Sequence, residues 1–256
     1  MSASRETSLR APHLAVLHLA LATLVVGVLS SCAVANPGPD HIDGLPSVEL
    51  ILKRYVEAVG GRETILGLTN RVATLHRITD MTWDRHIHEV DTLKIYGDSS
   101  GEFLIVTKSE RGTLLEGFDG NEEWKIDPTG QVSLSTAIGP RDRWMTDPRF
   151  PLKIRDYFPE MKVLGVDVWG TDLGGADEVF VVDIDGDESH RLGFDVETGL
   201  LVRMGYNRAL RDYREVDGVL MPMEVAYSRK GGSSTYYVDS VTHNERIDRT
   251  VFSLAK

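Results

Sequence analysis

The sequence predicts a mainly β protein, in which one wide antiparallel sheet takes up most of the chain. From about residue 71 onward, short runs rich in β-branched and aromatic residues follow one another, separated by turn signals such as Asp119-Gly120 and Asp217-Gly218. A helical stretch precedes these runs and a proline-rich stretch interrupts them. A sheet of roughly a dozen strands must curl, because strand twist accumulates and open flat edges aggregate. We therefore expect a barrel or half-barrel with an internal cavity.

The first element of the fold is expected to be an amphipathic helix that follows Ser47 and ends at Gly60-Gly61. Serine is a good N-cap residue, and glycine commonly ends a helix. Residues 62–68 can add a short helical turn. The apolar positions of the main helix recur at helical spacing and are Val48, Ile51, Leu52, Tyr55, Val56 and Val59.

The strands are placed by β-branched and aromatic runs that lie between turn-forming residues. Before residue 139 we expect strands near 71–79, 86–96, 102–108, 112–118, 121–127 and 130–135. After residue 159 we expect strands near 160–170, 177–184, 189–195, 199–206, 208–216, 219–229 and 234–241, with a last short strand at Val251 to Leu254. Short turns between consecutive strands make this an antiparallel meander.

The segment 139–159 combines four prolines with many aromatic side chains. Proline at this density precludes a long strand, whereas the aromatic side chains require burial. We expect one or two short helices packed on the sheet, and this segment is a candidate lid. Its candidate lid residues are Trp144, Phe150, Tyr157 and Phe158.

Alternation along the strands gives the sheet two unlike faces, one of them apolar. An apolar concave face would line the cavity, and flexible thioethers suit a surface that accepts irregular apolar groups. The methionines have an alternative role as core filling beneath the helices. The lipid-cavity candidates are Trp124, Ile126, Phe180, Val182, Val202, Met204, Met221, Met223 and Val225.

The only cysteine, Cys32, closes the run Leu29-Ser30-Ser31-Cys32 behind an apolar stretch and the basic residues Arg5 and Arg10. This arrangement resembles a lipobox, the cleavage and acylation signal of bacterial lipoproteins. The alternative is a transmembrane anchor, but Pro12, His13 and His18 weaken a span that is barely long enough. We expect a signal peptide at 1–31, lipidation at Cys32, a flexible tether at 32–46 and one domain at 47–256. Pro37, Gly38 and Pro39 are typical of such a tether.

Composition argues against several classes of partner. Without residues 1–31 the chain has 26 basic and 38 acidic residues and a net charge of −12, from 28 and 39 in the whole sequence. Nucleic-acid binding requires clustered Lys and Arg, so no nucleic acid is expected as a partner. The acidity also opposes attraction to anionic membrane surfaces.

Known catalytic and metal motifs do not stand out. His86 and His88 share a strand face, but further ligands at suitable spacing are missing. The run Asp183 to Glu188 resembles a calcium loop, but Phe194 stands where an EF-hand needs an acidic residue. The sequence has no nucleophile elbow and no phosphate-binding glycine motif. We therefore expect no enzyme activity, no cofactor and no metal.

Four motifs in order resemble the family of outer-membrane lipoprotein-sorting proteins, which are LolA/LolB-like and LppX-like half-barrel lipoproteins. They are ILKRYVEAVGGRETILGL, EGFDGNEEWKIDP, LGFDVETGLLVR and DYREVDGVLMPMEVAY, and the resemblance covers most of residues 48–254. It implies an unclosed antiparallel β half-barrel of about eleven strands, with an N-terminal helix and a short helical insertion covering a hydrophobic cavity for acyl chains. In this family the receptor is lipidated and the soluble carrier is not, so Cys32 favours a receptor-like or LppX-like member. Trp83 is either a packed turn residue or a membrane-touching loop tip.

Together these observations predict a lipid-anchored envelope protein that binds acyl chains of lipoproteins, or another lipid, in a hydrophobic cavity. We expect a monomer, held to a membrane through acylated Cys32, with the outer membrane facing the periplasm as its location. The alternative is an envelope sensory or structural domain of the same fold, with its cavity filled by its own helices and its surface bound to a protein partner. A tightly packed interior would favour that alternative.

Overall fold

The computed structural model describes residues 44–81, 87–134, 139, 142–170 and 176–254. Several predicted features lie outside the described residues, namely the expected signal peptide, Cys32, most of the expected tether, Trp83 and His86. In the part described, no helix is both long enough and apolar enough to cross a membrane.

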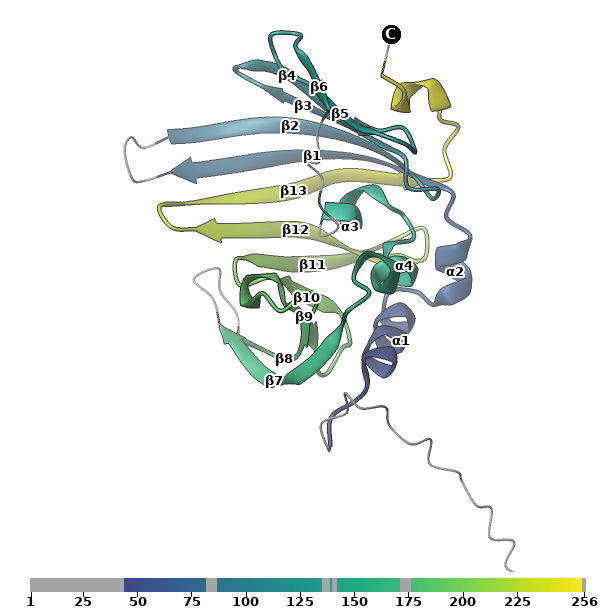
Figure 1. Ribbon diagram of the computed structural model, residues 1–256, viewed down its shortest axis with the longest axis vertical. Coiled ribbons are helices and arrows are strands. Elements are labelled where there is room, and N and C mark those ends of the chain that lie inside the picture. Colours follow the sequence, from purple (N-terminus) through teal and green to yellow (C-terminus); the bar gives the residue numbers. More distant parts are fainter. Residues whose placement is uncertain (1–43, 82–86, 135–138, 140–141, 171–175, 255–256) are drawn as a thin grey trace, which may run out of the picture. The chain divides into compact units, whose positions relative to one another are not determined.

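One antiparallel sheet of 13 strands holds the described chain together, in the order β6-β5-β4-β3-β2-β1-β13-β12-β11-β10-β9-β8-β7 (Figure 1). Strand β1 pairs with β13, so the first and last strands of the chain lie at the centre, and β6 and β7 form the two edges. The sheet is therefore unclosed. Its strands are β1 Asn70–Met81, β2 Ile87–Asp98, β3 Phe103–Ser109, β4 Gly112–Phe118, β5 Glu123–Ile126, β6 Val132–Leu134, β7 Lys162–Gly170, β8 Ala176–Asp183, β9 Leu192–Asp195, β10 Leu201–Met204, β11 Arg208–Val216, β12 Val219–Arg229 and β13 Gly232–His243.

Two expectations about the strands are wrong. The sheet has 13 strands rather than the about eleven that the resemblance implies, because each of the thirteen runs placed between residues 71 and 241 pairs with a neighbour, including the three-residue strand Val132–Leu134. The expected last strand at Val251 to Leu254 does not form: Val251 and Phe252 belong to a 3₁₀-helix, η3, at Arg249–Phe252, and no strand follows it in the described residues. The Asp248 side chain accepts a hydrogen bond from the Thr250 amide and caps this turn, which favours a helical start over an extended one.

Helix α1, Val48–Ala58, begins as the sequence predicts, because the Ser47 side chain accepts a hydrogen bond from the Leu50 amide. It ends at Gly60 and Gly61, both with positive φ. A Cβ on Gly60 would lie 2.3 Å from the carbonyl oxygen of Gly218, so only glycine lets the helix end meet the turn between β11 and β12. Helix α2, Arg62–Leu66, is the short additional turn.

Between β6 and β7 the chain forms α3, Arg143–Thr146, and α4, Phe150–Tyr157, as expected for the proline-rich segment. Pro151 lies in the first turn of α4, where its missing amide hydrogen costs nothing. We call residues 142–158 the covering segment, because they lie over one face of the sheet (Figure 1).

Two adjoining apolar clusters lie between the sheet and helices α1, α3 and α4. The larger contains side chains of all three helices together with residues of β7 to β12, including Val182, Leu192 and Met221. The smaller lies on β1, β2 and β3 and consists of Ala73, Leu75, Leu93, Ile95, Phe103 and Ile105. We call the sheet face that carries both clusters the inner face.

The C-terminal residues pack on the opposite face. Leu104, which alternates with the inward-facing Phe103 and Ile105, contacts Trp124 and Phe252 there. The Trp124 indole nitrogen donates a hydrogen bond to the Phe252 carbonyl oxygen at 3.1 Å. The indole also occupies the space above Gly117, where a Cβ would lie 2.4 Å from the ring. The chain end thus covers a second core.

We expect Phe252→Ala to lower the free energy of unfolding by about 3–5 kcal/mol, because it opens a cavity at a fully buried ring. Urea unfolding of the variant would measure this. The exposed neighbour Ser253→Ala is the matched control and should change stability by less than about 0.5 kcal/mol. Equal stability of the two variants would show that the C-terminal packing is dispensable.

Candidate functional site: the inner face of the sheet

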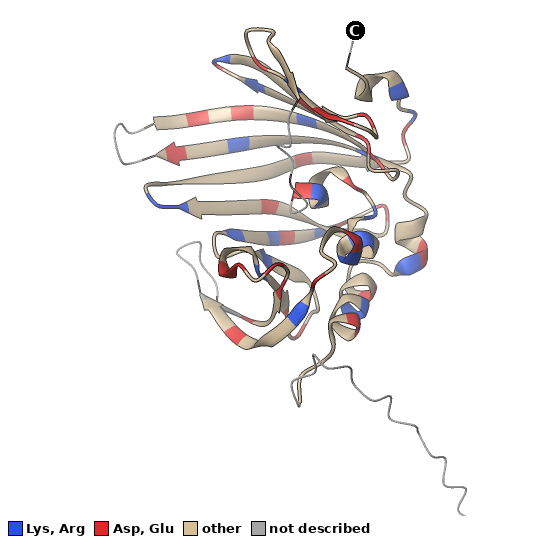
Figure 2. Cartoon of the chain, viewed as in Figure 1, with Lys and Arg blue, Asp and Glu red and all other residues tan. Residues whose placement is uncertain are grey.

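The inner face divides into an apolar part beneath the helices and a polar part beyond them. Along β1, Ala73 and Leu75 lie in the apolar cluster, whereas Arg77 and Thr79, at the next inward positions, line open cavities. Beyond the helices, β2 carries the two acidic residues Glu89 and Asp91, and β1 carries the basic Arg77 and the acidic Asp80 (Figure 2). The change from apolar to charged occurs between Leu75 and Arg77.

The apolar side chains of the covering segment pack against the apolar part of the inner face. Trp144, Phe150, Ile154 and Phe158 are buried members of the larger cluster. The backbone of α3 reaches the sheet at Gly97, where a Cβ would lie 1.7 Å from the Thr146 carbonyl oxygen. The segment therefore fills the space directly above β2.

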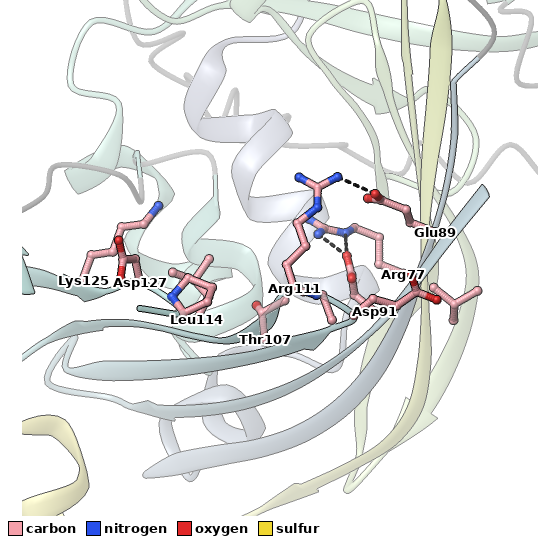
Figure 3. A pocket seen from close by; sticks show the side chains of 12 residues that line it. Arg77, Glu89, Asp91, Thr107, Arg111, Leu114, Lys125 and Asp127 are labelled. Carbon is pink, nitrogen blue, oxygen red and sulfur yellow. Dashed lines mark hydrogen bonds and ion pairs between the residues drawn. The ribbon is translucent and has the colours of Figure 1, made fainter. Parts of the chain in front are cut away.

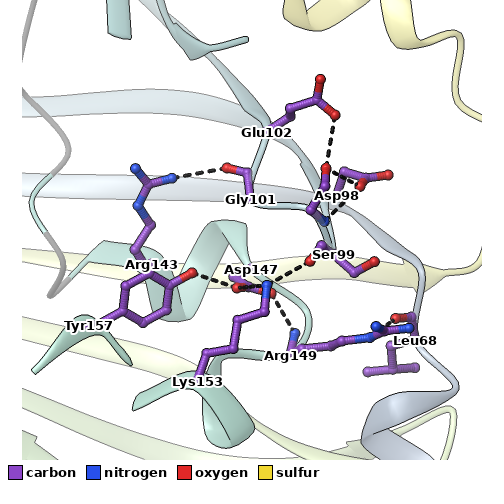
Figure 4. Close-up of polar contacts among 11 residues, drawn as sticks. Leu68, Asp98, Ser99, Gly101, Glu102, Arg143, Asp147, Arg149, Lys153 and Tyr157 are labelled. Atoms are coloured by element: carbon purple, nitrogen blue, oxygen red, sulfur yellow. Dashed lines mark hydrogen bonds and ion pairs between the residues drawn. The ribbon is translucent and has the colours of Figure 1, made fainter. Parts of the chain in front are cut away.

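Basic side chains fasten the covering segment by donating hydrogen bonds to backbone carbonyl oxygens (Figure 4). Arg149 bonds the carbonyl oxygens of Leu68 and Leu66 at 2.7 and 2.6 Å, and Lys153 bonds that of Ser99 at 2.6 Å. Arg143 bonds the Gly101 carbonyl oxygen at 3.1 Å and the Glu123 carboxylate at 3.0 Å. These contacts tie the segment to the ends of the strands rather than to their middle.

Asp147 lies at the centre of these attachments, and its side chain is 1% exposed. It accepts hydrogen bonds from the Tyr157 hydroxyl at 2.5 Å, from Lys153 Nζ at 2.9 Å and from the Arg149 amide at 2.8 Å. Burial, with help from this carboxylate, raises the pKa of Tyr157 well above its ordinary value. The phenol therefore stays protonated as a donor to Asp147.

A second buried group, Arg71 on β1, donates a hydrogen bond from the sheet to the covering segment. Its guanidinium donates to the Trp144 carbonyl oxygen at 2.8 Å and to Nε2 of His243 at 3.2 Å. Burial lowers the pKa of Arg71 to about 10, so the group remains charged at neutral pH, near the Asp147 carboxylate. Nδ1 of His243 lies 3.0 Å from the Asp217 carboxylate.

This arrangement predicts how stability depends on pH. Burial, and then the Arg71 charge, lower the pKa of His243, so the folded state binds fewer protons than an unfolded chain with a histidine pKa near 6.5. Neutral His243 therefore contributes to the free energy of unfolding above about pH 6.5. This contribution is lost as pH falls through the folded-state pKa, by at most about 1.4 kcal/mol per pH unit. Urea unfolding between pH 8 and pH 5 should therefore show a smaller acid-induced loss for His243→Gln than for the unmodified chain. Parallel curves would contradict this.

The structure brings many of the candidate residues together on the apolar part. Val182, Met204, Met221 and Val225 are buried in the larger cluster, and Phe180 packs against it. The candidate lid residues Trp144, Phe150 and Phe158 are buried in the same cluster, with Tyr157 at its edge.

Three of the other four cavity candidates pack on other surfaces. Trp124 and Ile126 belong to the outer-face cluster with Phe252. Val202 packs with Trp169, Val179 and Val181 on the far side of β8 and β9. Met223 is half-buried and belongs to none of the apolar clusters of the described residues.

Sequence reasoning missed the polar part of the inner face. Two adjoining cavities, of about 360 and 400 Å³, share the lining residues Arg77, Glu89 and Arg111. In the first, Arg77 pairs with Asp91 and Arg111 pairs with Glu89 (Figure 3). The available signal was the run of charged residues at the inward positions of β1 and β2 directly beyond Leu75 and Leu93, which are Arg77, Asp91 and Glu89.

The described residues contain no group of three or more His, Cys, Asp or Glu side chains arranged to hold a metal. His88 bonds Asp80 at 2.8 Å, and His190 bonds Asp185 at 2.6 Å. Asp187, from the run that resembles a calcium loop, caps the short 3₁₀-helix η2 at Glu188–His190.

The fold has counterparts among solved structures. A LolA-superfamily protein from Nitrosomonas europaea aligns over 82% of this chain and 99% of its own, with a TM-score of 0.54 and 11% identity. A DUF1329-family protein from Desulfovibrio piger aligns over 80% of this chain and 97% of its own, with a TM-score of 0.51 and 9% identity. No protein-family model and no curated protein matches the sequence. The chain therefore shares its fold with these two solved proteins, one of which belongs to the LolA superfamily, and this is the fold that the resemblance to lipoprotein-sorting proteins implies.

Proposed function

We propose that this protein is a non-enzymatic, lipid-anchored envelope protein that binds acyl chains of lipoproteins or of another lipid on the apolar part of its inner face. The observation that carries the proposal is the covering segment. It places four large apolar side chains over an apolar sheet surface, yet the hydrogen bonds that hold it reach residues at the ends of the strands. An acyl chain would take the place of the underside of this lid.

Burial of the lid side chains and burial of an acyl chain stabilise the protein by comparable free energies. Burial of Trp144, Phe150, Ile154 and Phe158 at about 1.5–3 kcal/mol each stabilises the closed lid by about 6–12 kcal/mol. A chain of about 14–16 methylenes gains about 11–13 kcal/mol on burial at about 0.8 kcal/mol each. An acyl chain can therefore offset the displacement of the lid, with a small enough surplus to allow release.

Unsatisfied polar atoms in α3 favour a lid that can move. Nε1 of Trp144 and Oγ1 of Thr146 are buried without a hydrogen-bond partner among the described residues. A buried polar group without a partner costs about 1–3 kcal/mol relative to one exposed to water. Lifting α3 would hydrate both atoms, which lowers the free-energy cost of opening.

The test is binding of a fluorescent 16-carbon acyl probe with an uncharged head group to the purified full chain. We expect one probe per chain, and binding at least about fivefold weaker in Val238→Gln, which places an amide on the inner face. The matched control is Ile78→Gln, because Ile78 is also half-buried but points to the outer face. Absence of saturable binding, or equal binding by both variants, would reject the proposal.

Anchoring and cargo binding should be separable. We propose that Cys32 carries the acyl anchor at the outer membrane facing the periplasm, and that the protein acts there as a monomer. Cys32→Ala is then expected to move the protein from the membrane fraction to the soluble fraction, because multiple acyl chains are needed for stable attachment. Acyl-probe binding should stay within about twofold of the unmodified chain. A variant that remains membrane-bound would contradict the anchor.

A second candidate function follows from the closed state itself. The apolar part of the inner face is filled by the protein's own helices, as expected for a sensory or structural envelope domain that binds a protein partner. Lipid extraction from native preparations followed by mass spectrometry distinguishes the two. Stoichiometric lipid supports the carrier or receptor function. Lipid-free protein that also fails to bind the acyl probe supports the sensory or structural function.

A further inference from the structure

The part of the inner face that the helices leave uncovered is lined by guanidinium groups. One cavity of about 400 Å³ is lined by Arg77, Arg111, Arg208 and Arg229, and among its described lining residues Glu89 is the carboxylate. Its volume falls within the about 300–1,000 Å³ typical of small-ligand sites. The described lining of this cavity has more positive than negative side chains, whereas the whole chain has a net charge of −11.

Two of the four arginines are held in place by the fold. Arg77 bonds the buried Asp91 and lies over the Tyr236 ring, 5.7 Å from its centroid. Arg208 pairs with Asp142 at 2.8 Å and lies 6.0 Å from the centroid of Tyr227. A carboxylate on one side and an aromatic ring on the other fix each guanidinium plane, which reduces the entropy lost when a ligand binds.

The other two arginines keep donors available. Arg229 is exposed, and among the described residues its hydrogen-bond partner is the Met81 thioether sulfur, a weak acceptor, at 3.7 Å. The Arg111 side chain is 73% exposed and contacts Glu89 with one of its nitrogens. An anionic ligand can therefore bind these groups without breaking a buried ion pair.

The chemistry of the lining selects the class of ligand. The described cations of this cavity are all arginines, whose planar donor fork matches the oxygens of a phosphate or carboxylate. The hydroxyls of Thr79 and Ser234 line the same cavity and add polar partners. The cavity also adjoins the apolar part of the inner face, since Arg77 follows Leu75 at the next inward position of β1.

We propose that this cavity binds the phosphate-bearing head group of an amphiphile whose acyl chain occupies the apolar part of the inner face. The inference rests on the proposed function and adds the class of its ligand, an anionic phospholipid. The head group is held by arginines and the chain by apolar side chains, so the step between Leu75 and Arg77 marks the boundary between the two parts of the ligand.

The test compares two fluorescent lipids with identical acyl chains, one with an anionic phosphoglycerol head and one with an uncharged glycerol head that lacks the phosphate, bound to the full chain. The variant is Arg111→Gln with Arg229→Gln, because neither side chain supports a buried carboxylate. The control is Arg62→Gln with Arg246→Gln, which removes the same charge from exposed positions outside the cavity. Inorganic phosphate serves as competitor.

We expect the anionic lipid to bind about tenfold more tightly than the uncharged one, and the Arg111/Arg229 variant to lose about tenfold in affinity for the anionic lipid alone. The control variant should bind like the unmodified chain. Equal affinity for the two lipids in every variant would overturn the head-group site while leaving acyl-chain binding intact. Displacement of the lipid by millimolar inorganic phosphate would show that the cavity binds free phosphate rather than a lipid head group. Failure of both lipids to bind would reject the proposed function itself.

Discussion

Replacing Gly97 by valine is expected to unseat the covering segment and to lower the free energy of unfolding by about 3 kcal/mol or more. A Cβ at this position would lie 1.7 Å from the Thr146 carbonyl oxygen, and the obstructing atom is backbone rather than a flexible side chain. Overpacking of a well-filled site usually costs about 1–3 kcal/mol, and a clash with backbone lies at the upper end. Urea unfolding would measure the loss of stability.

Gly139→Val is the matched control for this substitution. Its φ is not in the left-handed region, and a Cβ there meets no described atom within 4 Å. It should change stability by less than about 0.5 kcal/mol. If Gly97→Val unfolds at the same urea concentration as this control, the covering segment does not lie against β2.

Replacing Arg71 by methionine is expected to lower the free energy of unfolding by about 3–5 kcal/mol. The side chain is nearly fully buried, and its loss leaves the carbonyl oxygen of Trp144 and Nε2 of His243 without their donor. It also removes the positive charge that stabilises the buried Asp147 carboxylate. Breaking a buried charge interaction by deleting one partner typically costs about 3–5 kcal/mol.

The exposed Arg246→Met controls for the loss of one positive charge and should be close to neutral. Hydrogen exchange would locate the effect, because α3 should lose protection before the distant strands β8 and β9 do. A loss of less than about 1 kcal/mol, or uniform loss of protection, would show that Arg71 does not fasten the covering segment.

Local patterns were sufficient to predict most of the elements. The helix after Ser47, the turns at glycine pairs and the two short helices around Pro151 depend on residues within a few positions of each other. Such signals can be recognised from short stretches of sequence, without knowing which distant residues are in contact. The pairing of consecutive strands within β1 to β6 and within β7 to β13 also follows, because antiparallel strands joined by short turns become neighbours. The pairing of β1 with β13, which joins these two groups of strands, does not follow from the sequence.

Features that depend on distant partners were not predictable. Alternation shows that a strand has two faces but not which one is the inner face, so the pattern predicts Trp124 and Val202 in the cavity although they pack on other surfaces. Phe252 looked like part of a strand, since its partner Trp124 lies 128 residues away. Arg71 gave no signal, because a buried arginine is recognisable only with its partners Trp144 and His243 in place.

The central claim is that the covering segment yields the apolar part of the inner face to an acyl chain. Hydrogen exchange of the full chain, with and without a saturating 16-carbon acyl probe with an uncharged head group, tests it most directly. We expect the amides of residues 143–157 to exchange faster when the probe is bound, while those of β1 to β3 keep or gain protection. Unchanged exchange across residues 143–157 at saturating probe would contradict the account.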